Sequence, residues 1–502
     1  MTVNGSSMIL PILLSCILLY PILQPIYSYF RDARGLRQFP SPSYAGLSSL
    51  WRIGHAIRKK HYLAVHNAHK ALGTHVRIAP NHISICDPTA MNEIYGHGAN
   101  LLKEGWYDGG ARTYRNMGDT RDKAEHQSKR KKFAHVFAQK TIVGLEPMVH
   151  SMVQTLNSEI DKRAAYGETI NMRRYLNYFT IDLISKLLFG ESLGCMIRGN
   201  DTVAAETKDG KVYETALIEA LHRSMSVNTC LGMEAPLLPY TTRLFAWHPY
   251  RRAGSRFEDI VYHNTMKRLR KTEEQDDFFA KLLVNNKGEE LNLELGEILA
   301  ESGVIMNAGS DTTTSALTST VFLLYKHPRV LAKLREELDA NLGDVAIPTY
   351  EAVANLTYLR ACVEESLRLR PAQSIGLPRT VPPGGRTIAG RFIQEGVAVS
   401  VPTYTLLRDP RAFEKPETYN PDRWLTGDRA TMARYHLPFS VGPRACIGRN
   451  IAYFEQLIVI ANLVKNYDFE LPSSDFELEN IERLNSNPGE LPMRVRRRTN
   501  GV

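Results

Sequence analysis

One cysteine near the C-terminus lies in a setting that suits a metal-bound thiolate. The segment Phe439-Ser-Val-Gly-Pro-Arg-Ala-Cys446-Ile-Gly runs directly into an apolar, helix-like stretch at residues 451–460. A thiolate is stabilised by backbone N–H groups, a helix N-terminus and nearby positive charge, and this segment offers all three. Glycines on both sides let the backbone approach the sulfur and a flat ligand. We predict that Cys446 is the axial ligand of a haem iron.

The segment resembles the haem-binding signature of the cytochrome P450 family, F-x-x-G-x-R-x-C-x-G. Every fixed position matches: Phe439, Gly442, Arg444, Cys446 and Gly448. The resemblance implies a haem b cofactor whose iron is bound by Cys446. Phe439 shields the sulfur, and Arg444 pairs with a haem propionate. The alternative is a buried core cysteine, but three further signatures at the expected places argue against it.

The longest predicted helix, residues 292–327, contains residues that weaken helices. Gly309 and the three threonines 312–314 are poor in a helix interior, and threonine hydroxyls can bond back to the preceding turn. Residues 308–313 resemble the oxygen-activation motif of the P450 family. That resemblance implies catalytic roles for Asp311, which feeds protons from solvent, and Thr312, which donates a hydrogen bond to bound oxygen. The alternative is a threonine cluster that serves only helix packing.

A pair of opposite charges precedes the cysteine. Glu365 and Arg368 are three residues apart on one helix face, and Pro371 ends that helix. The pair resembles the family's E-x-x-R element, and residues 419–424 resemble its later P-E-R-F segment. The resemblance implies a buried network of Glu365, Arg368 and Arg423 that locks the core on the haem side.

Two more stretches imply partners for haem propionates. One resembles the family's W-x-x-x-R, with His126 in place of the tryptophan and Arg130 in its usual place. Arg379, after a Leu-Pro pair, matches another propionate-binding arginine. The alternative for these residues is an ordinary surface charge.

Three lysines surround Arg130 on its predicted helix. We assign Arg130 inward and place Lys129, Lys131 and Lys132 at the surface. There they either steer an acidic flavoprotein reductase towards the cysteine side of the haem or are simply solvated.

The periodicity of the chain predicts a mainly α-helical fold with small β-sheets. Apolar residues recur at three- and four-residue spacing in seven stretches, 124–137, 142–165, 171–188, 213–225, 255–270, 292–327 and 329–342. Residues 76–85 and 390–401 are typical of strands. No change of composition marks a second soluble domain, so we expect one cytochrome P450 fold, the haem-thiolate catalytic domain, over residues 51–502.

The N-terminal stretch predicts a membrane anchor. Residues 8–30 carry no charge, and arginines follow at positions 31, 34 and 37. We expect a transmembrane anchor over residues 1–30 and a proline-containing hinge over residues 31–50. The protein is then single-pass in the endoplasmic reticulum membrane, with its catalytic domain cytosolic. The alternative, a cleaved signal peptide, lacks the usual basic start.

Charge and cysteine content narrow the partners. The formal charge of +9 over 502 residues suits membrane lipid or an acidic redox protein, and no nucleic-acid motif is present. The six cysteines are scattered without a C-x-x-C pair, which suggests no disulfide framework and fits a reducing compartment.

Together these resemblances imply a monooxygenase that oxidises a hydrophobic small molecule with O2. Its electrons come from NADPH through NADPH–cytochrome P450 reductase. The pair Asp311–Thr312 favours this over a haem-thiolate isomerase or dehydratase, which needs no external electrons, and over a haem sensor. Framework stretches such as residues 76–80 and 119–126 resemble the fungal benzoate para-hydroxylase lineage. Members of that lineage also tailor secondary metabolites, a role we favour over benzoate hydroxylation. We expect substrate contacts from residues 103–119, 217–245 and 372–377 and from the predicted helix 292–327, which contains the oxygen-activation motif.

Overall fold

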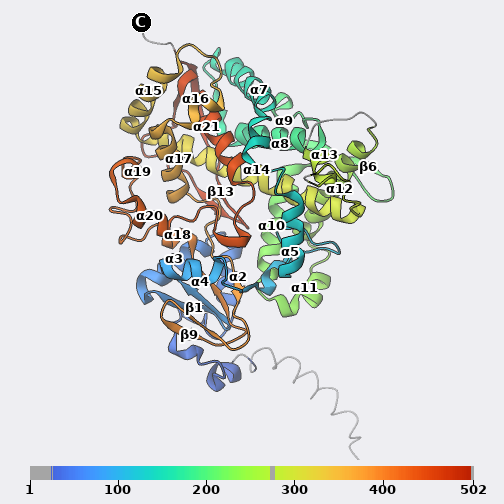
Figure 1. The fold of residues 1–502 in the computed structure, drawn as a ribbon, viewed down its shortest axis with the longest axis vertical. Helices are drawn as coiled ribbons and strands as arrows, with labels where there is room; N and C mark the ends of the chain where they lie inside the picture. The colour runs from blue at the N-terminus through green and yellow to red at the C-terminus, as the bar shows by residue number, and fades with distance from the viewer. Residues whose placement is uncertain (1–23, 25, 272–277, 286, 499–502) are drawn as a thin grey trace, which may run out of the picture.

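The computed structural model describes residues 24, 26–271, 278–285 and 287–498. It is mainly helical with small sheets, as the periodicity predicts. Helices form most of the molecule in Figure 1, and a β-rich part lies at the lower end, where blue N-terminal strands meet orange strands from late in the chain. The sheet at this end therefore joins segments that lie far apart in the sequence.

The helices are α2 (Leu50–Ile57), α3 (His61–Leu72), α4 (Pro88–Tyr95), α5 (Lys123–Phe133), α6 (Gln139–Val143), α7 (Glu146–Ala164), α8 (Met172–Phe189), α9 (Cys195–Arg198), α10 (Leu217–Gly232), α11 (Leu238–Leu244), α12 (Pro249–Leu269), α13 (Phe278–Leu283), α14 (Leu295–Lys326), α15 (Pro328–Leu342), α16 (Tyr350–Ala354), α17 (Thr357–Leu369), α18 (Thr403–Leu406), α19 (Arg423–Thr426), α20 (Arg429–Tyr435) and α21 (Arg449–Asn466), with 3-10 turns η1 (Leu36–Gln38), η2 (Gly105–Gly109), η3 (Ala235–Leu237) and η4 (Gly442–Arg444). The strands are β1 (His75–Ala79), β2 (His82–Ile85), β3 (Leu102–Lys103), β4 (Thr169–Asn171), β5 (Thr202–Glu206), β6 (Val212–Ala216), β7 (Arg379–Thr380), β8 (Arg386–Ile388), β9 (Arg391–Ile393), β10 (Ala398–Ser400), β11 (Tyr467–Glu470), β12 (Asn480–Glu482), β13 (Ser486–Pro488) and β14 (Pro492–Arg497).

The largest sheet joins the two ends of the sequence. Its strand order is β1-β2-β10-β7-β3, with β10 parallel to β2 and antiparallel to β7. The predicted hairpin at residues 76–85 forms β1 and β2. In the pairing of β3 with β7, Lys103 lies opposite Arg379. The sheet thus places two basic residues side by side that are far apart in the chain.

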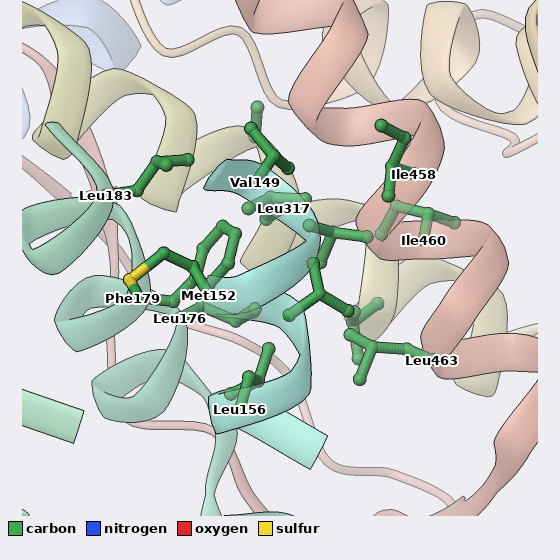
Figure 2. Close-up of a cluster of buried hydrophobic side chains, with 14 of the residues drawn as sticks. Val149, Met152, Leu156, Leu176, Phe179, Leu183, Leu317, Ile458, Ile460 and Leu463 are labelled. Carbon is green, nitrogen blue, oxygen red and sulfur yellow. The ribbon is translucent and has the colours of Figure 1, made fainter. Parts of the chain in front are cut away.

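The main core is formed by four helices. Side chains of α7, α8, α14 and α21 point towards one another in Figure 2. Nearly every residue of α8 is buried, as expected for a helix in the interior of a large domain. A Cβ on Gly309 of α14 would lie only 2.8 Å from Ile184 of α8, so the glycine allows these helices to pack closely.

Two predicted helices differ in the structure. Residues 213–216, predicted as helix, belong to strand β6, which pairs with β5, and α10 begins only at Leu217. Pairing with a neighbouring strand outweighed the local helical spacing. The stretch 142–165 is divided into α6 and α7, because Gly144 follows the first helix and Pro147 lies in the first turn of the second.

The predicted anchor lies almost entirely outside the described residues. Where the chain is described, no helix combines the length and apolar character needed to cross a membrane. The predicted hinge packs on the sheet: Phe39 is buried, and Arg77 N of β1 donates to Pro40 O (2.8 Å).

Candidate active site

A cavity of about 800 Å³ lies in the interior of the molecule. This volume is in the range of small-molecule and cofactor sites. The structure brings most of the predicted site residues to its wall: Cys446, Arg444, Phe439, Gly448, His126, Arg130, Arg379 and Thr312. Residues 103–119, α10, α14 and residues 372–377 also contribute, as expected for substrate contacts. The sequence did not point to the lining from α12 or from Leu484 and Asn485.

The Cys446 thiol faces this cavity. Its backbone N donates to Phe439 O (2.9 Å), which folds the loop before α21 so that the side chain is exposed on the cavity wall. The surrounding protein raises the pKa of the thiol by burial, while the Gly448 N–H and the charges of Arg130 and Arg449 act in the opposite direction. The predicted thiolate-stabilising groups are therefore all present, and a bound metal would complete deprotonation.

The two glycines of the signature have different roles. Gly442 has a φ of +73°, and a Cβ there would lie 2.0 Å from Tyr95 O at the end of α4. Only glycine suits that conformation and that contact. A Cβ on Gly448 would lie 3.9 Å from the Cys446 sulfur, an ordinary contact. Gly448 therefore matters through its N–H rather than through lack of space.

Five basic side chains line one part of the cavity, and we call them the basic cradle: Lys103, His126, Arg130, Arg379 and Arg444. Burial, followed by the charge of Arg379, lowers the pKa of Arg444 to about 10. Burial and the charges of Arg444 and Lys103 lower the pKa of His126 to about 3. A cluster of mutually repelling cations fits an anionic ligand, and the two propionates of haem are such groups.

The cradle residues also hold the loops around the cysteine. Arg130 Nη1 donates to Ala445 O (2.7 Å), next to Cys446. Arg444 Nη1 donates to Thr120 O (2.6 Å), in the loop before α5. Lys103 Nζ donates to Gly118 O (2.5 Å). Sequence reasoning placed Lys103 only in the segment 103–119 expected to contact substrate. It missed the place of Lys103 in the cradle, because that depends on the register of β3 against β7, which no local pattern encodes.

Thr312 lies where the motif predicts. Its hydroxyl donates to Ala308 O (2.7 Å), one turn back, and the half-buried residue lines the cavity. Thr314 makes the same kind of bond to the preceding turn, as do Ser310 and Ser315, which the sequence analysis did not single out. The helix nevertheless stays continuous from Leu295 to Lys326.

Asp311 is fully buried and is not part of the cavity wall. One carboxylate oxygen accepts from His222 Nε2 of α10 (2.8 Å), and the other accepts from Asn485 Nδ2 (3.0 Å) and Asn487 Nδ2 (2.8 Å). Burial alone would raise the pKa of Asp311, but these donors outweigh it and hold the pKa well below its usual range. His222 and the two asparagines escaped the sequence analysis because they lie far from the motif.

The predicted charged network is present. Arg368 makes two bonds to Glu365 (2.8 and 2.9 Å), and Arg423 Nε donates to the same carboxylate (3.0 Å). Trp424 Nε1 adds a fourth bond (2.9 Å). Arg368 and Glu365 are wholly buried, and the guanidinium of Arg368 also reaches three backbone carbonyls.

The surface placement of Lys129 is wrong. Its side chain is buried, and its Nζ lies 3.1 Å from Glu297 and 3.3 Å from Glu301 of α14. Lys131 is exposed, and Lys132 is half-buried. Two carboxylates on the neighbouring helix draw Lys129 inward, a contact that the lysine run itself does not reveal.

A helical fold with a cysteine and a basic cradle around one large cavity is typical of a haem-binding enzyme. The profile of the cytochrome P450 family matches residues 42–492, and the chain belongs to that family. P450 proteins are haem-thiolate enzymes in which a cysteine binds the haem iron, and this chain is a cytochrome P450 monooxygenase.

Similar proteins come from fungi. Benzoate 4-monooxygenase bphA of Aspergillus niger is 30% identical over 504 residues, which cover 96% of each chain. Cytochrome P450 monooxygenase traB of Penicillium crustosum is 31% identical over 460 residues, covering 87% of this chain and 86% of the relative. The crystal structure of the cytochrome P450DA heme domain aligns with a TM-score of 0.74 over 92% of this chain and 97% of that chain, at 21% identity. This last likeness supports the fold.

Proposed function

We propose that this monooxygenase hydroxylates or otherwise oxidises a hydrophobic small molecule in fungal secondary metabolism, using O2 and electrons from NADPH. The observation that carries the proposal is the cavity that contains both Cys446 and Thr312. Its volume of about 800 Å³ lies in the range of sites that hold a cofactor or a small-molecule ligand. The similarity to a benzoate 4-monooxygenase supports a second candidate, para-hydroxylation of a benzoate-type aromatic acid.

Each side chain of the haem-binding segment and the basic cradle has a role in the proposed reaction. Bound haem supplies the oxidising chemistry, in which one atom of O2 enters the substrate and the other leaves as water. Cys446 would hold the iron as a thiolate, with Phe439 covering the sulfur. The basic cradle binds the propionates and fixes the orientation of the cofactor.

Proton delivery falls to Thr312 and Asp311. Thr312 lines the cavity, and once its hydroxyl releases Ala308 O it would be free to donate a hydrogen bond into the cavity. Asp311 reaches the cavity only if it leaves His222 and the two asparagines. Delivery of a proton by Asp311 therefore includes a rearrangement of its side chain.

Membrane attachment rests on two surfaces. The uncharged stretch at residues 8–30 anchors the chain in the endoplasmic reticulum, with the catalytic domain in the cytosol. Exposed apolar residues near α11 add a second contact: Leu237, Tyr240, Leu244, Phe245 and Trp247. The neighbouring Leu238 is buried and does not belong to this surface. NADPH–cytochrome P450 reductase on the same membrane supplies the electrons.

Three measurements test the proposal. Cys446→Ser should abolish the red-shifted Soret band of the reduced CO complex, and a normal band would refute the thiolate assignment. Thr312→Ala should keep substrate binding but divert electrons from NADPH into peroxide. Product formation without NADPH and reductase would favour an isomerase or dehydratase.

A substrate panel separates the two candidates. Benzoates and larger fungal metabolites are titrated against the haem protein, and the low-to-high-spin shift of the Soret band reports binding near the iron. A shift with benzoates alone would favour the aromatic-acid hydroxylase over the tailoring role.

A further inference from the structure

A second, small cavity of about 30 Å³ lies beside the active site. Its walls come from α2, α3, β2, β10 and the segment after α17. Trp106 lines both this cavity and the active-site cavity, so its side chain is part of the wall between them. Trp106 Nε1 donates to Thr229 O of α10 (3.2 Å). A change in the small cavity therefore acts on a residue of the active-site wall.

The guanidinium of Arg52 is the charged group of this cavity. Arg52 Nη1 donates to His82 Nδ1 (3.3 Å), and Nη2 donates to Met233 O. Its Nε has no hydrogen-bond partner within the described parts of the chain. No carboxylate of the described residues lines the cavity or forms an ion pair with Arg52. Burial lowers the pKa of Arg52, and the nearby Glu234 and Glu104 oppose this without contact.

His61 is the polar group of the wall that is best suited to donate a hydrogen bond. It is 6% exposed, and both of its ring nitrogens lack a partner among the described residues. The other polar groups are already paired: His82 Nε2 lies 2.8 Å from Ser400 Oγ, Ser84 Oγ lies 2.8 Å from His69 Nε2, and Ser374 Oγ donates to Pro371 O. An anion can accept from an imidazole N–H and a guanidinium at once.

The local charges do not cancel. Burial lowers the pKa of His61 to about 3, so this imidazole is neutral at physiological pH. Glu482, whose Oε1 is 3.7 Å from His61 Nδ1, has its pKa raised to about 8 by burial and holds a proton. The wall of the cavity is left with the single positive charge of Arg52, which is half-buried, and the carboxylates of Glu234 and Glu104 act on it only from a distance. An anion bound against the guanidinium would be a closer counter-ion.

We propose that this cavity binds one small monovalent anion of halide size, such as chloride, against the Arg52 guanidinium. At about 30 Å³ the cavity is far smaller than the roughly 300–1,000 Å³ of a small-molecule site, so a small inorganic ion is the occupant that it suits. The bound anion joins α2 and β2 to Met233 and Trp106, and so stabilises the wall of the active site.

Thermal unfolding of the full-length haem protein tests the site. Sodium chloride or bromide is compared with sodium gluconate, whose anion is much larger, at equal ionic strength. Wild-type protein should gain about 1–3 °C in Tm, saturating with halide concentration. Arg52→Met should lose this response. Arg77→Met is the control, since Arg77 is a buried arginine of strand β1 that does not line the cavity.

Diffraction from wild-type crystals grown in bromide gives an independent readout that needs no variant. One anomalous peak in the cavity beside Arg52 is expected. Halide and gluconate giving equal Tm values, or density for water only, would overturn the proposal. A halide response kept by Arg52→Met and lost by Arg77→Met would do the same. None of these outcomes bears on the monooxygenase reaction.

Discussion

The Glu365 network and the basic cradle are both buried clusters of charged side chains, but their charges are balanced in different ways. The network is complete within the protein: one carboxylate meets two guanidinium groups and an indole N–H. The cradle gathers like charges that lower one another's pKa. A buried cluster that satisfies itself serves the scaffold, whereas one that does not is built around a ligand.

Breaking the satisfied cluster should have the largest effect. Arg368→Met removes two bonds to Glu365 and leaves three carbonyls without their donor. We expect the free energy of unfolding to fall by about 3–5 kcal/mol, measured by urea denaturation. Arg174→Gln is the control, because its pair with Glu490 is exposed and contributes less than about 1 kcal/mol. A loss for Arg368→Met as small as that of the control would contradict the scaffold role.

Glu455 represents a third case, a buried carboxyl that keeps its proton. It lies on α21 in the cavity wall, and burial raises its pKa to about 8. The folded state therefore holds a proton that the unfolded chain releases near pH 4.5, so stability is present at low pH and falls as pH rises from about 5 to 8.

Glu455→Gln removes this titration. Relative to wild type, the variant should be more stable at pH 8, on the order of 4 kcal/mol, and little changed at pH 5. Urea denaturation at the two pH values measures the difference. Glu470→Gln, on an exposed position of β11, controls for the loss of an acidic side chain. If the free energy of unfolding changed equally between pH 5 and pH 8 in wild type and Glu455→Gln, Glu455 would not be the group that titrates.

A substitution in the basic cradle should weaken haem binding rather than the stability of the fold. Arg379→Gln removes a charge that lowers the pKa of Arg444, and it also removes the bond from Arg379 Nη1 to Tyr107 Oη (2.8 Å). The two effects oppose each other, so the haem-free protein should keep its stability. Haem retention should fall about tenfold or more, since a charge-assisted hydrogen bond to a propionate is worth roughly 1.5–3 kcal/mol. Haem transfer to excess apomyoglobin measures retention. Arg391→Gln, on an exposed position of β9, is the control. If the haem-free protein lost stability instead, Arg379 would belong to the scaffold.

The sequence predicted what local patterns encode. Periodicity located the long helices, and short motifs located Cys446, the Glu365–Arg368 pair and Thr312. It did not reveal that Lys103 joins the basic cradle, because this depends on the register of β3 against β7. Nor did it reveal that His222 of α10 contacts Asp311 of α14. The strand at residues 212–216 was missed for the same reason, because pairing with β5 decides it. Contacts between distant segments have no local signature.

The same contrast recurs among the lysines of α5. Lys129 is buried between two carboxylates, whereas Lys131 is exposed on a helix that touches the Cys446 loop through Arg130. We expect Lys131→Glu to slow the first electron transfer from the reductase about two- to tenfold at low ionic strength. Substrate binding should not change, because charge complementarity mainly accelerates association and is screened by salt. Stopped-flow reduction at several salt concentrations measures the effect.

Two variants make this smallest prediction specific. Lys211→Glu makes the same reversal at an exposed position beside β6, away from the cysteine loop, and should leave the reduction rate unchanged. Lys129→Gln should lower the stability of the protein, because Glu297 and Glu301 lose their common cation. A reduction rate for Lys131→Glu that matches wild type at every salt concentration would show that this lysine is only solvated. The reductase would then dock elsewhere, and burial alone would distinguish Lys129 from Lys131.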